Sequence, residues 1–561
     1  MIDIASLPKP SPEEAARFLG HATLGYTRAE VDDLVARGYA AWFTTQFGIP
    51  VTRHASHFDW LKSKFPYYKA PVGEEFLFTR LTNSSLRRFV EGSDTLRQKM
   101  TFSLSQILVT SIFVGIDINW RQYAGAGYLD LLTANAFGTY RNLVGEVTKS
   151  PLMAMYLTFL GSQKGTATRS PDENYARELL QLFTIGVDTL NQTAGSSYGT
   201  PTNAEPYPKS SIAQLARVFT GFYFNGYYSY SGAAGSTYES ERYNYRNQST
   251  TQPGLLASTV THDTNAITLA ISPNVPALNL PAVSSPTPAG IQSRVSMALD
   301  HILAHPNVAP FICSQLIQRF VTSNPSPDYL RRVAQVFNSS GGNLTEVIKA
   351  VLMDESLFDA SKRRVGGLAD DTFGKVREPF TRLVQWARAT GATSIKGNWD
   401  TGWYESGINY PSKLGQAPLM ASSVFNFYRP GYVAPGSQIA KRLSPDGKRP
   451  LVAPELQITD EVTTVAYINF MAEAIDTDRG VSGMGDVRST YAALTPLAGN
   501  PTALVAELNL LLAAGRLNSV NKTRIAQAVS SLPQATALDM RKRVQSAVLM
   551  VMAAPEYIVQ K

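Results

Sequence analysis

The chain has 561 residues, 44% of them hydrophobic, which is long enough for several domains or for one large domain with a substantial core. Its formal charge is +7, yet only 17% of its residues are charged and no basic run exceeds three residues. A nucleic-acid interface gathers lysine and arginine on one face, so we do not expect nucleic acid as a partner. No apolar stretch is long enough to predict a membrane span. A single cysteine, Cys313, excludes intramolecular disulfides and cysteine-cluster metal sites.

Helical periodicity dominates from the first residues onward. A helix is predicted over 12–19, with Ser11 as its N-cap and Pro12 in its first turn. A second helix over 29–37 is expected to stop at Gly38, and the segment 95–111 is apolar around much of its circumference, as in a core helix. Further helices are predicted at 125–148, 171–187, 211–220, 291–304, 308–321, 328–338, 344–353, 374–389, 461–474, 502–513, 521–530 and 539–552. The sequence therefore predicts a mainly α protein, a large multi-helix globular body.

Long irregular insertions interrupt this helical pattern. Residues 191–290 are rich in Gly, Ser and Tyr, whereas 1–190 and 291–561 read as the N-terminal and C-terminal helical parts of one domain. Long loops are usually functional or mobile, so aromatic residues in them are candidates for contacts with a ligand. Such residues are Tyr228 in the first insertion, and Trp399 and Trp403 in a shorter irregular stretch.

The segment 170–183 carries the strongest local signal. Ser170 is predicted to cap a helix, with Glu173 three residues later reaching back to the Ser170 amide in a capping box. Arg177 and Glu178 then share a polar face of this helix. That face is either a solvated surface or a cleft in which Glu178 acts as an acid or base, and periodicity does not separate the two.

The six histidines differ in the roles that the sequence predicts for them. His262 and Asp263 are adjacent in a loop context and could supply metal ligands or a proton relay. The sequence fails the zinc-protease pattern at 301–305, so His305 is expected to be structural, as is His21 at the end of the first helix. His54 and His57 are predicted to lie at the surface.

Several segments together resemble one bacterial family, the domain of unknown function 1800 (DUF1800). The resemblance runs in order along nearly the whole chain, through residues 15–25, 96–107, 136–141, 171–186, 216–221, 262–263, 305–321, 375–379, 423–428 and 554–557. Members of this family are large and mostly exported, and their genes often lie beside those of an exported sulfatase-like family. The resemblance implies a periplasmic or secreted protein, although residues 1–5 do not begin a signal peptide in this numbering, and a cytoplasmic location stays open.

The resemblance implies no established activity or cofactor, but it points to ionisable residues within the matching segments. A core that holds so many charges must pair them or line a cleft with them. These positions are Arg97, Lys99, Asp172, Glu173, Glu178, Arg217, His262, Asp263, Arg319, Lys375, Arg377 and Glu378.

Our leading hypothesis is an enzyme, a hydrolase or lyase, that acts on an extracellular polysaccharide in a polar cleft. Paired carboxylates cleave glycans as acid and base, so Glu178 would act with Glu173, Asp172 or Asp263, beside His262. The residues expected to bind substrate are Arg177, Arg217, Arg97, Lys99, Tyr228, Trp399 and Trp403.

Two alternatives remain open at this point. The first is a non-enzymatic envelope scaffold, a binding partner of the sulfatase-like protein, in which the charged residues form buried structural pairs. The second is a metal-dependent hydrolase that uses His262 and Asp263.

Overall fold

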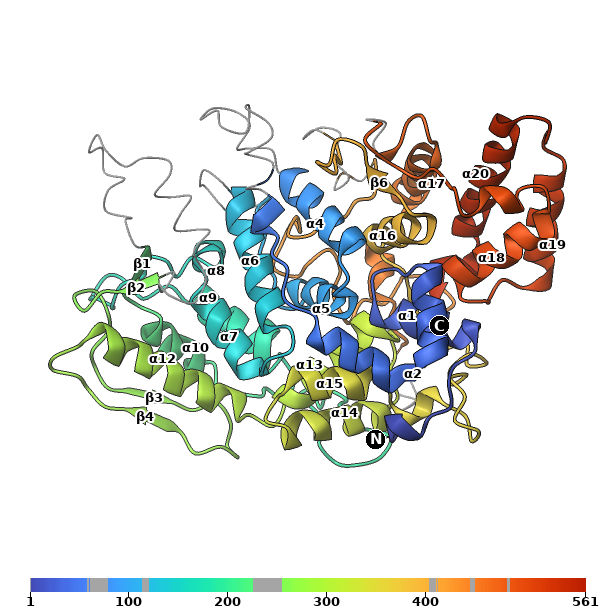
Figure 1. Cartoon of the computed structure of the whole chain (residues 1–561). Coiled ribbons are helices and arrows are strands. Elements are labelled where there is room, and N and C mark those ends of the chain that lie inside the picture. Colours follow the sequence, from blue (N-terminus) through green and yellow to red (C-terminus); the bar gives the residue numbers. More distant parts are fainter. Residues whose placement is uncertain are drawn as a thin grey trace, which may run out of the picture.

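The computed structural model describes residues 2–57, 60, 79–113, 121–224, 255–402, 410, 412–443, 450–481 and 485–561, and every structural statement below concerns these residues. Helices make up most of the described chain, which confirms the predicted mainly α class (Figure 1). The described strands are two or three residues long and occur in four separate antiparallel pairs.

The first part of the chain is built from short and medium helices. They are η1 (Ile4–Ser6), α1 (Pro12–Ala22), α2 (Arg28–Gly48), α4 (Thr79–Glu91), α5 (Thr95–Ser105), α6 (Arg121–Asn135), α7 (Tyr140–Thr148), α8 (Pro151–Tyr156), α9 (Asn174–Glu178), the π-helix η3 (Leu179–Thr184) and α10 (Ser210–Val218).

Two hairpins and a long helix follow, and then the C-terminal helices. The strands are β1 (Phe222–Phe224), β2 (Leu255–Ala257), β3 (Ile267–Leu269), β4 (Leu278–Leu280), β5 (Lys375–Val376), β6 (Thr393–Ser394), β7 (Val487–Arg488) and β8 (Val559–Gln560). The helices are α12 (Pro288–Leu303), α13 (Val308–Phe320), α14 (Pro327–Ser339), α15 (Leu344–Leu352), η5 (Glu355–Leu357), α16 (Pro379–Thr390), η7 (Pro454–Ile458), α17 (Glu461–Ile475), η9 (Thr495–Leu497), α18 (Pro501–Ala513), α19 (Ser519–Ser530), α20 (Ala537–Ala553) and α21 (Pro555–Ile558).

The N-cap predicted for α1 is present. The Ser11 side chain accepts a hydrogen bond from the Glu14 backbone N–H, and the Glu14 carboxylate accepts one from the Ser11 backbone N–H at 2.7 Å. The second helix does not end at Gly38 but is broken there, because this glycine has φ 81° and ψ 172° and the helix resumes to Gly48. Phe18 of α1 packs edge-to-face on Trp42 of the resumed segment, with ring centroids 4.9 Å apart.

Helix α5 lies in the middle of the molecule (Figure 1). All of its residues from Thr95 to Ser105 are buried, which confirms the prediction of a core helix, although it ends six residues earlier than 111. A helix buried on every side must satisfy its polar side chains internally, so its charged residues lie within the core.

The two ends of the molecule carry different parts of the chain. Figure 1 shows α10, α12 and the hairpins of β1–β4 at one end, and α18, α19 and α20 at the other. Strand β8 returns the C-terminal residues to the middle, where it pairs with β5. Within the described residues, no helix has both the length and the apolar composition needed to cross a bilayer.

Candidate functional site

The predicted capping box at Ser170 is wrong. Helix α9 begins four residues later, at Asn174, and the side chain of Asp172 accepts a hydrogen bond from the Asn174 backbone N–H at 2.8 Å. Glu173 pairs instead with Arg177, one turn along, at 2.9 Å on the exposed surface. Asp172 therefore helps to start the helix, and Glu173 faces solvent rather than Ser170.

Glu178 lies where α9 changes into the π-helix η3. Single-turn π segments within helices are often found at functional sites, because they displace side chains from the regular helical faces. The Glu178 side chain is only 9% exposed, and among the described residues no hydrogen bond or ion pair reaches its carboxyl group. Burial raises the pKa of Glu178, while the neighbouring charge of Arg177 acts in the opposite direction.

An open cavity of about 380 Å³ adjoins this helix. Its wall combines the exposed face of α9 and η3 with the segment that leads into α10: Glu173, Arg177, Gln181, Val187, Glu205, Pro206, Tyr207, Lys209 and Ile212. Glu178 does not line the cavity itself, but it and Glu205 both act electrostatically on Tyr207, which does. Burial raises the pKa of Tyr207 to about 12, so this phenol stays protonated and can donate a hydrogen bond.

A second, larger cavity shares one lining residue with the first. It measures about 440 Å³, and Val187 lines both cavities. Its wall is mostly apolar, with Tyr198 and Phe311 among its residues, and it holds the amide of Gln315, whose buried Nε2 has no hydrogen-bond partner. The first cavity is therefore lined mainly by polar and charged side chains, and the second mainly by apolar ones.

His262, Asp263 and Arg217 form a separate group. Arg217 Nε donates to Asp263 Oδ2 at 2.7 Å, and the His262 Nδ1 lies 2.9 Å from the backbone carbonyl of Thr220. Burial lowers the pKa of His262. Burial alone would raise the pKa of Asp263, but the hydrogen bonds from Arg217 and Asn265 together with the charge of Arg217 outweigh it and leave this pKa lowered. None of the three lines the cavity beside Glu178.

This group does not provide a metal centre within the described residues. No three His, Cys, Asp or Glu side chains there lie close enough to hold a metal ion. The Asp263 carboxylate is already occupied by Arg217 and by the Asn265 backbone N–H, which leaves His262 Nε2 as a lone buried nitrogen.

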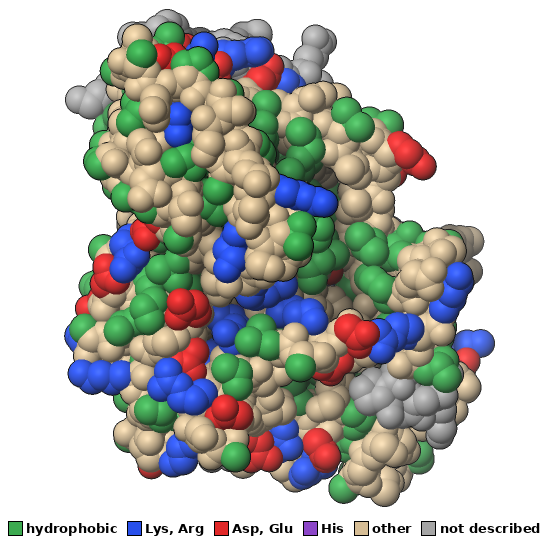
Figure 2. All heavy atoms as spheres, turned by 90° about the vertical axis from the view of Figure 1, so that its right-hand side faces the viewer, with side chains coloured by type: hydrophobic (Ala, Val, Ile, Leu, Met, Phe, Trp, Pro, Cys, Tyr) green, Lys and Arg blue, Asp and Glu red, His purple; other side chains and the backbone are tan. Residues whose placement is uncertain are grey.

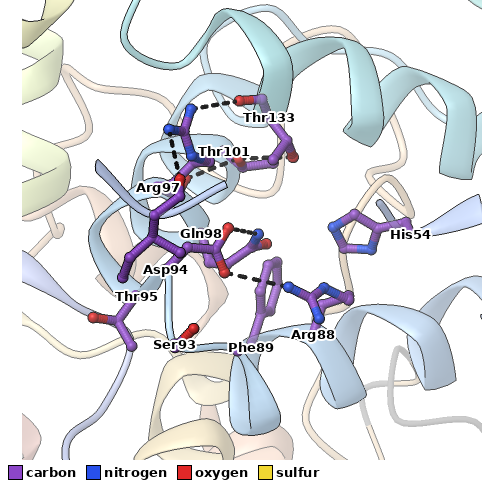
Figure 3. Close-up of polar contacts among 12 residues, drawn as sticks. His54, Arg88, Phe89, Ser93, Asp94, Thr95, Arg97, Gln98, Thr101 and Thr133 are labelled. Atoms are coloured by element: carbon purple, nitrogen blue, oxygen red, sulfur yellow. Dashed lines mark hydrogen bonds and ion pairs between the residues drawn. The ribbon is translucent and has the colours of Figure 1, made fainter. Parts of the chain in front are cut away.

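Arg97 and Lys99, both expected to bind substrate, lie inside the core. Figure 3 shows the Arg97 guanidinium turned toward the Thr133 carbonyl, on the far side of α5 from the buried Asp94, Arg88 and Gln98. The same guanidinium stacks on Phe137 at 4.3 Å from the ring centroid. Arg97 is only 7% exposed, so its side chain links α5 to neighbouring parts of the core and does not face a solvent-filled cavity.

Lys99 belongs to a cluster of charges that the sequence distributes over the whole chain. Lys375 lies 3.0 Å from Glu455 and 4.0 Å from Glu378, and Glu378 also accepts hydrogen bonds from Gln106 and Gln416. The members with charge are Lys99, Arg319, Lys375, Glu378 and Glu455, each at most 5% exposed. Glu455 was not singled out from the sequence, because it lies in an irregular segment rich in Pro and Gly.

Trp399, which was expected to bind substrate, does not lie on a surface that a ligand could reach. Trp399 is 1% exposed, and its indole N–H donates to Glu91 at 3.1 Å, so its ring is packed in the interior and offers no stacking surface. Tyr228 and Trp403 lie outside the described residues.

The histidines expected at the surface are buried. His54 and His57 are 0% and 3% exposed, since the loop before α4 folds over α6 and Asp130 of α6 accepts hydrogen bonds from the backbone of residues 54 and 55. His305 has the predicted structural role, with Nε2 3.0 Å from the Pro206 carbonyl. His21 is likewise buried, with its Nδ1 3.0 Å from Arg364.

The comparisons with known proteins bear on the family only. No curated protein and no solved structure matches this chain. The family described as "protein of unknown function (DUF1800)" matches residues 17–559, nearly the whole sequence. The chain therefore belongs to the DUF1800 family.

Proposed function

We propose that the protein is an exported enzyme that cleaves an extracellular or envelope polysaccharide, with Glu178 as the proton donor. One observation carries the proposal: a buried carboxyl group with a raised pKa and no partner among the described residues, beside an open cavity with a second carboxylate. A carboxyl group whose pKa is raised keeps its proton to higher pH than usual and can donate it to a leaving oxygen, as the acid of a glycan-cleaving pair does.

Glu205 is the best-placed partner carboxylate. It lines the cavity, and both it and Glu178 act electrostatically on Tyr207. Glu173 also lines the cavity, but it is held by Arg177, and it lies five positions before Glu178, a spacing that puts the two on different faces of a helix. Asp172 is hydrogen-bonded at the start of α9, and Asp263 is paired with Arg217.

The extended wall suits a polymer better than a small molecule. Arg177 and Lys209 would hold anionic or hydroxyl groups at the charged end, and the apolar cavity beyond Val187 would accommodate the faces of further sugar rings.

The test measures cleavage by Glu178→Gln over a panel of neutral and acidic polysaccharides, by reducing ends and by the absorbance of unsaturated products. We expect activity to fall by 10²- to 10⁴-fold, the usual contribution of a general acid, with the melting temperature unchanged. Glu461→Gln, on the exposed start of α17, is the matched control and should retain full activity. A folded Glu178→Gln protein that retains full activity, or a wild type that cleaves no member of the panel, contradicts the proposal.

A second candidate is the envelope scaffold, a binding partner of the exported sulfatase-like protein. The observation in its favour is that many of the family-like charged residues are sealed in internal pairs, such as Lys375 with Glu455 and Arg217 with Asp263. Under this candidate the wild type cleaves nothing and is recovered, after cross-linking in cells, with the sulfatase-like protein. Recovery of the protein alone counts against it.

A further inference from the structure

The larger cavity, of about 440 Å³, has a single charged residue in its wall. Among the described residues that line it, Asp188 alone carries a charged side chain, and the others are apolar, aromatic or neutral and polar. A cavity of this size with few polar groups is typical of a site for a small organic ligand or for one unit of a polymer, because the polar groups fix the orientation of an otherwise apolar contact.

The backbone around Asp188 is held by Asn307, the residue before α13. The Asn307 side chain donates to the Asp188 carbonyl at 2.7 Å and accepts from the Leu190 backbone N–H at 3.0 Å. Next to it, the Thr189 backbone N–H donates to the Ala204 carbonyl at 2.8 Å. These contacts use backbone atoms only. In the part of the chain that the structure describes, no hydrogen bond or ion pair reaches the Asp188 carboxylate.

The basic residues of the smaller cavity, which shares Val187 with this one, do not supply the missing charge. Arg177 lies 2.9 Å from Glu173, and Lys209 lies 3.3 Å from Glu205. Each of these cations therefore has a carboxylate of its own.

Arg331, which acts electrostatically on Tyr198 in the cavity wall, is likewise paired, at 3.2 Å from Asp328. Much of the surface shows the same arrangement: in Figure 2, acidic side chains lie next to basic ones over the lower half of the face that carries α18–α20. Asp188 differs, because its carboxylate is unpaired in a mostly apolar cavity, where an ammonium group would attract it more strongly than in water.

A second polar group in the wall also lacks a partner. Gln315 is 7% exposed, and its Nε2 has no hydrogen-bond partner among the described residues. A buried N–H without an acceptor costs free energy, which an oxygen atom of a ligand would recover. The neighbouring amide of Gln318 is not free in this way, since its Nε2 donates to the carbonyls of Ser323 at 3.0 Å and Pro430 at 3.3 Å.

The remaining wall suits the body of the ligand. Tyr198 and Phe311 supply aromatic surface, against which the apolar face of a sugar ring packs and which also attracts a cation. The cavity thus combines a carboxylate for a cation, an N–H group for an oxygen and aromatic surface for a ring. An amino sugar has all three complementary groups.

We propose that this cavity binds an amino sugar with a free amine, whose ammonium group pairs with Asp188 and one of whose oxygens accepts a hydrogen bond from Gln315. The inference rests on the proposed function, since it names the kind of unit in the polymer that the enzyme would hold next to the cavity beside Glu178.

The experiment measures binding by calorimetry to the Glu178→Gln protein, in which no probe is expected to be cleaved. The probes are the disaccharides of glucosamine, N-acetylglucosamine and glucose with the same linkage, at a mildly acidic pH at which the amine is protonated. We expect the glucosamine disaccharide to bind about tenfold or more tightly than the other two, because it alone carries a cation. No binding of this disaccharide, or equal binding of all three, overturns the proposal.

Asp188→Asn, added to the same protein, should weaken binding of the glucosamine disaccharide about tenfold or more. Its melting temperature should not change, because the substitution keeps the backbone carbonyl that Asn307 binds. Asp478→Asn, at an exposed position outside the cavity wall, is the matched control and should leave binding unchanged. A folded Asp188→Asn protein that binds the disaccharide as tightly as before contradicts the proposal.

Gln315→Leu tests the contact with the sugar oxygen. It should weaken binding of the glucosamine disaccharide but not of benzylamine, which has an ammonium group and a ring but no oxygen. Tighter binding of benzylamine than of the disaccharide, before this substitution, overturns the assignment to an amino sugar. Because binding is measured apart from cleavage, a wild type that binds as expected but cleaves nothing contradicts the proposed function and leaves this inference standing.

Discussion

Lys99 and Lys375 lie in the same buried cluster, but their surroundings differ. Lys375 is in direct contact with Glu455 and also donates to the Arg319 carbonyl at 3.1 Å. Lys99 lies over the ring of Phe320 at 5.4 Å and reaches no carboxylate within 4.0 Å in the described part of the chain. Burial, followed by repulsion from Lys375, lowers the pKa of Lys99 to about 7, so near neutral pH its charge is only partly present.

The same substitution should therefore change the free energy of unfolding strongly at Lys375 and only slightly at Lys99. Lys375→Met leaves Glu455 buried without its cation and should lower the free energy of unfolding by about 3–5 kcal/mol. Lys99→Met leaves two cations, Arg319 and Lys375, facing two carboxylates, and should change it by less than about 1 kcal/mol. Chemical denaturation at pH 7 measures both values. Equal losses in the two variants would contradict this assignment of the charge balance.

At the scale of single elements, the break in α2 depends on one backbone conformation. Gly38 has φ 81° and ψ 172°, a region open almost exclusively to glycine, and a Cβ added there meets only Lys9, at 4.0 Å. Gly48, at the end of the same helix, has no such φ, and a Cβ there would meet nothing within 4 Å. Comparing substitutions at the two positions therefore isolates the effect of backbone strain, because an added Cβ is not crowded at either one.

We expect Gly38→Ala to lower the free energy of unfolding by about 1–3 kcal/mol through strain alone. Gly48→Ala should be neutral or stabilising by up to about 1 kcal/mol, since alanine restricts the unfolded chain. Urea unfolding curves of both variants test this pair. If Gly38→Ala is as stable as the wild type, the break in α2 is not imposed by this glycine.

The element that carries Glu178 shows the same dependence on local backbone geometry. A regular helix would continue the faces of α9 past Glu178, whereas the π-helix η3 rotates the following residues, and the Ile185 backbone N–H donates to the Leu180 carbonyl five residues back, at 2.9 Å. The polar face predicted from the sequence is therefore split, with Arg177 and Gln181 toward the cavity and Glu178 turned inward.

At the scale of the whole molecule, buried neutral histidines determine the response to acid. Burial lowers the pKa of five of the six: His21, His54 (to about 3), His262, His301 and His305. Burial acts in the opposite sense on three carboxyl groups and raises the pKa of Asp94, Asp130 (to about 7) and Glu178.

These histidines and carboxyl groups together determine whether the free energy of unfolding rises or falls with pH. An unfolded histidine takes up a proton below about pH 6.5, whereas a folded one with a lowered pKa takes it up only at lower pH, so stability is lost as the pH falls below about 6.5. The three carboxyl groups keep their protons to higher pH when folded than when unfolded, so they favour the folded state as the pH falls toward their unfolded pKa values of about 4. Because the histidines outnumber the acids, we expect the free energy of unfolding to decrease from pH 7 to pH 5.

Chemical denaturation at pH 5, 6, 7 and 8 measures this decrease, at about 1.4 kcal/mol per pH unit for each net proton taken up on unfolding. The slope of the free energy of unfolding against pH therefore gives the net number of protons taken up on unfolding. A free energy of unfolding that is equal or higher at pH 5 would show that the raised carboxyl groups outweigh the histidines.

The sequence by itself determined the mainly α class, the buried position of α5 and the N-cap of α1 at Ser11. These features depend on periodicity and on residues within one or two turns of each other, which a linear pattern contains. The pattern also singled out Arg217 and Asp263, which lie 46 positions apart and are paired in the structure.

Only the tertiary structure decided which polar residues face water and which are sealed in the core. Glu173 and Glu178 look alike in sequence, but one is exposed and the other is buried at the start of a π-helix. Lys375 and Glu455 are 80 positions apart, and they pair because β5 contacts η7. The partners of a buried charge are set by the packing of distant helices, and local residue spacing contains no information about that packing.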